Sequence, residues 1–135
     1  MKKGRMNIFL IDGLGAMLST IGLIVILGNQ TAFGISINTL YPFLCLGIMY
    51  SCNSMRCYFF KPLKLQMNLQ IVAILNLVYL GAVIILIFKK LSTLTKYGIA
   101  YFIIEAIIIL SISAYEFKII KRLQANAVRS HPLPA

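Results

Sequence analysis

Four stretches of about twenty residues in this chain are almost continuously apolar: 7–27, 40–60, 69–88 and 97–117. The hydrocarbon core of a bilayer is about 30 Å thick, and a helix that rises about 1.5 Å per residue needs about 20 residues to cross it. Each stretch therefore has the length and composition of one transmembrane helix. Because the connections are only about 8–12 residues long, consecutive helices should lie antiparallel. The sequence predicts an all-α fold, an integral membrane four-helix bundle with up-down-up-down order.

The composition leaves no room for a separate soluble domain. Hydrophobic residues make up 60% of the 135 residues, and the mean hydropathy is +0.90. A water-soluble domain of this length could not cover so much apolar surface. We therefore expect a single transmembrane domain, 1–135, that ends in a cytoplasmic tail, 118–135.

The basic residues flank the apolar stretches and predict the orientation of the chain. Twelve of the thirteen Lys and Arg residues lie outside the four stretches, and they form no aromatic-interleaved basic surface of the kind that binds nucleic acid. Cytoplasmic termini would place nine bases inside the cell and three, in the 89–96 loop, outside. By the positive-inside rule, we expect a multi-pass protein of a bacterial cytoplasmic (inner) membrane, with both termini cytoplasmic and anionic lipid head groups as contacts.

The basic start of the chain and the apolar run after it leave a cleaved signal peptide as an alternative. The run of 21 residues is longer than the usual 7–15, and it contains Asp12. No A-x-A sequence precedes the first polar loop. These departures favour a retained transmembrane helix.

Small and polar residues recur along one face of each stretch and predict which face lies inside the bundle. Small residues let helix backbones approach closely where lipid supplies no hydrophobic drive for association. On the first two stretches, the residues that share such a face are Asp12, Gly15, Ser19 and Gly22, and then Gly47, Ser51 and Ser54.

Four charged residues lie inside the apolar stretches, and three of them should lie at a similar depth. In the predicted topology, Asp12, Arg56 and Glu116 all lie near the cytoplasmic boundary. An unpaired ion there would cost several kcal/mol, so we expect Arg56 to pair with Asp12, Glu116 or both. This charge cluster is either a structural staple that fixes helix order, or a site for an anion or a lipid head group that opens inward.

Glu105 lies near the middle of the fourth stretch, where no base shares its depth. Hydrocarbon disfavours an ionised carboxylate, so we expect a largely neutral acid with Tyr101, Asn76 and Tyr79 as partners. Tyr50 and Asn53 are shallower candidates. Our candidates for ligand binding or proton carrying are Glu105, Tyr101, Asn76 and Tyr79. The alternative is a protonated acid that only joins helices.

No pattern in the sequence predicts a metal or a cofactor. Cys45, Cys52 and Cys57 are seven and five residues apart, which matches no C-x-x-C redox or zinc motif. The single histidine, His131, lies in the polar tail. We therefore expect no metal, no cofactor and no catalytic residue of a recognised kind.

The order of elements resembles a family of small, uncharacterised bacterial four-span membrane proteins. The residues that carry the likeness are IDGLGA (11–16), CYFF (57–60), Asn76 with Tyr79, YFIIE (101–105) and the segment from Glu116 to Lys118. The resemblance implies four spans and no particular activity. A fainter likeness, to GtrA-type flippase subunits, comes from the size, the basicity and the segment NSMRCYFF (53–60).

These observations favour a non-enzymatic membrane protein, either an accessory subunit or a small transporter-like carrier. Four short helices enclose little volume, so a carrier would work as a homodimer or with a membrane partner subunit. The competing function is a membrane-embedded enzyme or a lipid head-group binding protein that uses Glu105 and the charge cluster. In the enzyme, Tyr101 and Asn76 would position the substrate. No nucleophile–base pair is visible, and no nucleic acid is expected as a partner.

Overall fold

The structure is a computed structural model that describes the backbone of residues 2–60 and 63–130, and the side chains of residues 7–60 and 63–130. Nearly all of this part of the chain is helical, and none of it forms a strand. The all-α prediction is confirmed. The helices are α1 (Lys2–Gly28), α2 (Gln30–Phe33), α3 (Ile37–Phe60), α4 (Leu65–Lys90) and α5 (Lys96–Ser130).

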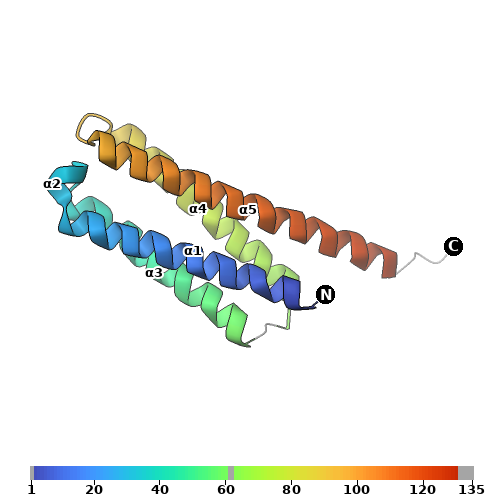
Figure 1. Ribbon diagram of the computed structural model, residues 1–135. Coiled ribbons are helices and arrows are strands. Elements are labelled where there is room, and N and C mark those ends of the chain that lie inside the picture. Colours follow the sequence, from blue (N-terminus) through green and yellow to red (C-terminus); the bar gives the residue numbers. More distant parts are fainter. Residues whose placement is uncertain (1, 61–62, 131–135) are drawn as a thin grey trace.

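The four long helices form two antiparallel hairpins (Figure 1). α1 packs along α3, and α4 packs along α5, while fewer contacts of α1 with α5 and of α3 with α4 join the two hairpins. The first turn of α1, the end of α3, the start of α4 and the end of α5 all lie at one end of the molecule. We call this end the terminal end and the opposite one the α2 end.

A short turn structure ties the two hairpins together at the α2 end. Gly34 ends α2 with a left-handed backbone (φ 69°), and a Cβ there would collide with the carbonyl oxygen of Thr93. Thr95 donates its hydroxyl to the carbonyl of Ala32 (2.5 Å) and its backbone N–H to that of Phe33 (3.2 Å). Glycine is required where the backbone turns left-handed and another chain segment approaches this closely.

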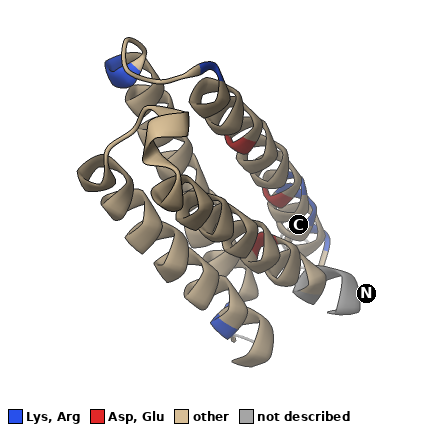
Figure 2. Ribbon diagram, turned by 60° about the vertical axis from the view of Figure 1, so that its left-hand side comes forward, with Lys and Arg blue, Asp and Glu red and all other residues tan. Residues whose placement is uncertain are grey.

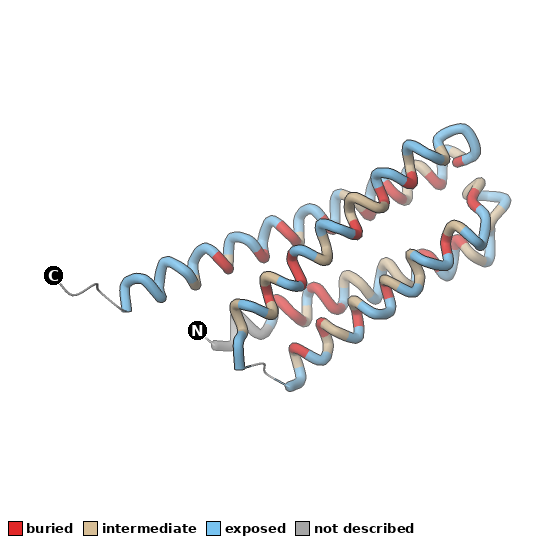
Figure 3. The backbone as a smooth tube through the Cα atoms, turned by 180° about the vertical axis from the view of Figure 1, so that it is seen from behind, coloured by how far each residue is buried: buried red, intermediate tan, exposed pale blue. Residues whose placement is uncertain are grey.

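Two boundaries differ from the sequence prediction. The connection at 28–39 contains the short helix α2, and α5 continues for thirteen residues beyond 117, through most of the expected tail. Residues 131–135, including His131, lie outside the described residues. Most side chains of this extension are exposed (Figure 3), because no other helix reaches so far along the bundle axis. The extension is therefore a helix with little packing of its own.

Three helices are long and apolar enough to cross a membrane: Asn7–Gly28, Leu65–Lys90 and Lys96–Ser130. Their outward faces carry large exposed apolar side chains such as Leu18 (62%), Ile74 (56%) and Ile107 (59%), which suit contact with lipid rather than water. Among the described helices, α3 has the length but does not reach the same hydropathy. Its polar residues, including Asn53 and Arg56, lower the average.

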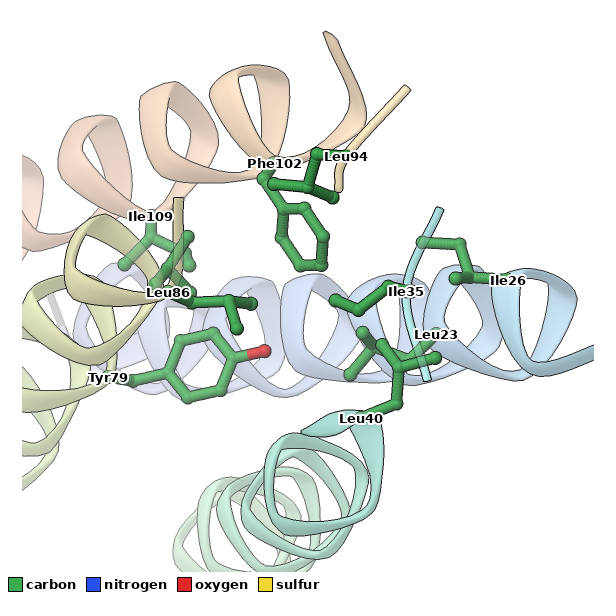
Figure 4. Close-up of a cluster of buried hydrophobic side chains, with 10 residues drawn as sticks. Leu23, Ile26, Ile35, Leu40, Tyr79, Leu86, Leu94, Phe102 and Ile109 are labelled. Carbon is green, nitrogen blue, oxygen red and sulfur yellow. The ribbon is translucent and has the colours of Figure 1, made fainter. Parts of the chain in front are cut away.

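The apolar core is divided into two clusters along the bundle axis. The α2-end cluster, drawn in part in Figure 4, is built around Leu23, Ile26, Phe102 and other buried side chains of all four long helices. The terminal-end cluster includes Ile8, Phe9 and Ile120. We call the polar side chains in the interior of the bundle the polar layer: Asp12, Ser54, Asn76, Tyr79, Glu105 and Glu116, of which all but the half-buried Asn76 are buried. Asp12 and Glu116 therefore lie between the two apolar clusters, whereas Glu105 and Tyr79 lie among the side chains of the α2-end cluster.

Candidate functional site

Two carboxyl groups meet on one amide at the centre of the polar layer. Asn76 on α4 donates its side-chain N–H groups to Asp12 on α1 (2.7 Å) and to both carboxylate oxygens of Glu116 on α5 (3.2 and 3.4 Å). Asp12 also accepts a hydrogen bond from the hydroxyl of Ser54 on α3. Asp12 is 4% exposed and Glu116 is fully buried. All four long helices therefore contribute to one site, which lies where the two hairpins meet.

Small residues on α1 and α3 allow this site to form. Ser51 donates to the backbone carbonyl of Gly13 (3.4 Å), the residue after Asp12. A Cβ at Gly47 would lie 2.8 Å from the hydroxyl of Thr20, so the two helices are in close contact there. Close backbone approach brings the short side chain of Ser54 within reach of the carboxylate. The small-residue face predicted for α3 therefore lies against α1.

Glu105 forms a second site, nearer the α2 end. Its Oε1 accepts a hydrogen bond from the hydroxyl of Tyr79 (3.0 Å). The side chain is 4% exposed, and its Oε2 has no partner within the described part of the chain. Tyr101, which we expected to contact Glu105, donates instead to the backbone carbonyl of Ser19 on α1 (3.2 Å). Among the described side chains, Tyr79 thus forms the clear hydrogen bond to Glu105, and Ser19 on α1 is a near polar neighbour of the same carboxyl.

A small cavity of about 30 Å³ lies beside both sites. Its walls include Asp12, Ser19, Tyr50, Asn76 and Tyr79. A cavity needs about 10–15 Å³ and two to four polar partners to hold a water molecule. This one meets both conditions.

Arg56 lies away from the two carboxyls with which it was expected to pair. Its side chain is exposed, and its guanidinium donates to Asn53 one turn earlier on α3 (3.2 Å). Across the described side chains, Arg56 forms no ion pair with Asp12 or Glu116. Successive helical residues are about 100° apart, so Arg56 lies about 200° from Ser54 around α3. When Ser54 faces Asp12, Arg56 must face outward.

The pairings of Asn76 and Ser54 also differ from expectation. Asn76 bonds the Asp12–Glu116 pair rather than Glu105, whereas Tyr79 bonds Glu105 as expected. Ser54 was recognised only as a small residue on the inner face of its helix. Its position at the depth of Asp12 was the signal that could have identified it as a partner.

The site contains the elements of ion or proton binding rather than of covalent catalysis. Within the residues that the structure describes, no group of three or more His, Cys, Asp or Glu side chains could hold a metal ion. Of the cysteines, only Cys57 is buried, and it belongs to the terminal-end cluster. The polar layer offers three carboxyl groups, one amide, and the hydroxyl groups of a serine and a tyrosine, with the cavity beside them.

No family model matches the chain, and neither a curated protein nor a solved structure matches it. The resemblance to small four-span bacterial proteins therefore stays a prediction from the sequence.

Proposed function

We propose that this protein is a four-helix integral membrane protein in which α3 crosses the membrane together with the three more apolar helices. The extensive packing of α3 against α1, in the antiparallel direction, supports a common membrane level for both. The charged residues support the orientation with both termini in the cytoplasm of a bacterium, because bases lie mainly at the terminal end (Figure 2). Its location would be the cytoplasmic membrane.

We further propose that the protein is a small carrier, and that the Asp12–Asn76–Glu116 site binds a proton or a small cation. One observation carries this proposal: two buried carboxyls from different hairpins meet at one half-buried amide, and no described basic side chain accompanies them. An uncompensated buried charge costs several kcal/mol. The site is therefore complementary to a proton or to a cation of similar charge and small size.

The position of the site supports transport of the bound proton or cation rather than its permanent binding. Apolar clusters lie beyond the Asp12–Asn76–Glu116 site toward both ends of the bundle. The two hairpins contact each other less extensively than the helices within each hairpin do. Rigid-body motion of one hairpin against the other would open the site at one end or the other. The small volume of the cavity beside the site, about 30 Å³, fits an ion better than a large substrate and favours a homodimer or a partner subunit for larger cargo.

The binding of cations to purified protein in detergent tests this proposal. We expect saturable binding of at least one of radiolabelled sodium, rubidium and methylammonium, and loss of that binding in Asp12→Asn and in Glu116→Gln. Ser111→Ala is the matched control, because Ser111 is exposed on α5 and bonds only its own helix backbone (2.8 Å). Circular dichroism would verify that each variant is folded. If a folded wild type binds none of the three cations, the cation-binding form of the carrier is wrong.

Binding of an anionic lipid head group is a second candidate function, supported by a different observation. Arg56 lines an open pocket of about 330 Å³ with Cys57, Phe60 and Asn68 between α3 and α4. A planar guanidinium beside an apolar wall suits a phosphate that is attached to acyl chains. Native mass spectrometry should find fewer retained anionic lipids on Arg56→Gln than on the wild type. Equal retention would remove this candidate.

A further inference from the structure

We infer that the cavity beside Asp12 is a water-filled proton path that joins Glu105, through Tyr79, to the Asp12–Asn76–Glu116 site. This inference deepens the proposed carrier function and rests on it. The path makes Glu105 the proton acceptor of the carrier. A cation that enters between Asp12 and Glu116 is then exchanged for a proton held deeper in the bundle.

The first step is the protonation of Glu105. Its side chain is almost fully buried, with one oxygen bonded by Tyr79 and the other without a partner in the described structure. A buried carboxylate with a bare oxygen would cost several kcal/mol if it were ionised. Glu105 therefore holds a proton in this closed arrangement.

The second step is the connection between the two sites. Tyr79 donates to Glu105 and also lines the cavity, while Asp12 and Asn76 line the same cavity from its other side. Water in this space has polar neighbours on at least three helices. A single residue thus contacts Glu105 and the cavity, and the cavity contacts the carboxyl pair.

In the third step, each transfer along the path moves one proton between Asp12 and Glu105. A cavity water gives a proton to the oxygen of Tyr79 as Tyr79 gives its own hydroxyl proton to an ionised Glu105. The water then regains a proton from Asp12. The reverse sequence discharges Glu105 to Asp12. Tyr79 is neutral before and after each transfer, so no tyrosinate has to persist in the apolar interior.

The fourth step is the direction of the path. Phe102 and Ile109 of the α2-end cluster flank Glu105 along α5, and Ile109 also lines the cavity, so apolar side chains surround this carboxyl. Because Tyr79 bonds Glu105 and also lines the cavity, protons reach Glu105 through Tyr79 from the carboxyl pair. The titratable side chains that surround the path are the three carboxyls, Tyr50 and Tyr79 at the cavity, Tyr101 beside Ser19, and Cys57 in the terminal-end cluster.

Carboxyl hydrogen–deuterium exchange, followed by infrared spectroscopy after transfer to deuterated buffer, tests the path. The carbonyl bands of protonated Glu105 and of the Asp12–Glu116 pair are assigned by their loss in Glu105→Gln and in Asp12→Asn. Ala16→Val adds two methyl groups to the wall of the cavity, and Tyr79→Phe removes the linking hydroxyl. Ala114→Val is the matched control, because Ala114 is exposed on α5.

We expect Ala16→Val and Tyr79→Phe to slow the exchange of Glu105 about tenfold or more, since protons must then wait for a larger opening of the bundle. The exchange of the Asp12–Glu116 pair should keep its wild-type rate in both variants. Ala114→Val should change neither rate. Unchanged exchange of Glu105 in both variants, or equal slowing of both bands, would overturn the path. Cation binding that survives such a result would leave the cation-binding form of the carrier standing, whereas its absence in the wild type would end that form and, with it, the cation–proton exchange along the path.

Discussion

Replacement of Asn76 by leucine should destabilise the bundle more than any other single change at a neutral residue of the polar layer. Asn76 donates to two carboxyl groups on two different helices. Interhelical hydrogen bonds in membrane proteins average about 0.6 kcal/mol and reach about 1.7 kcal/mol. Two of them give an expected loss of about 1–3 kcal/mol in the free energy of unfolding for Asn76→Leu. Leucine has nearly the same size, so little packing is lost.

Reversible unfolding in mixed micelles, followed by circular dichroism, measures this loss. Asn68→Leu is the matched control, because Asn68 lies on the same helix and bonds only the backbone carbonyl of Lys64 (2.9 Å). Mutual repulsion of the two carboxyls should make the loss larger at alkaline pH, where both are more often ionised. If Asn76→Leu and Asn68→Leu unfold alike at every pH, the amide does not hold the carboxyls together and the reasoning fails.

Two further substitutions test the geometry around this site and at the α2 end. Ser54→Ala should lose the hydrogen bond to Asp12 and about 0.5–1.7 kcal/mol of unfolding free energy in the same micelle assay, and no loss would mean that the two side chains do not meet. Gly34→Ala should cost about 1–2 kcal/mol because the backbone there is left-handed and the Cβ would meet Thr93. Gly28→Ala, with no atom near its Cβ, is the control and should leave the unfolding free energy within about 0.5 kcal/mol. Equal effects of the two glycine changes would contradict the tight turn.

The sequence predicted the helices well because the bilayer restricts the possible structures so strongly. A stretch such as 69–88 is too apolar for water, and a helix satisfies its backbone hydrogen bonds internally. The extra turns of α5 were missed because beyond 117 the sequence becomes polar, which marks the end of an apolar stretch but not the end of a helix. Helix ends depend on local backbone bonding, which hydropathy does not report.

Which residues form the site was harder to predict from the sequence than the depth at which they lie. Depth placed Asp12, Arg56 and Glu116 together, but depth ignores rotation about the helix axis. The rotation of α3 that brings Ser54 to Asp12 turns Arg56 outward. The small residues on α3 contained this information, because they define its inner face. A test of each charged residue against that face would have excluded Arg56.

The partner of Asn76 could not be obtained from the sequence, because it depends on how α4 crosses α5. Asn76 and Tyr79 lie on one face, only about 4.5 Å apart along the axis. Glu105 and Glu116 are about 16 Å apart along α5. The long side chain of Tyr79 reaches Glu105 while the short one of Asn76 meets Glu116. Side-chain length and crossing geometry, rather than residue type, decided these pairs.

Proton release on cation addition tests most directly the claim that the two buried carboxyls bind either a proton or a cation. A saturating dose of sodium, rubidium or methylammonium chloride would be added to purified protein in weakly buffered detergent solution with a pH indicator. The account predicts release of about one proton per chain from the wild type and none from Asp12→Asn or Glu116→Gln, because a bound cation replaces the proton that the pair holds. The same release from the folded variants as from the wild type would contradict it.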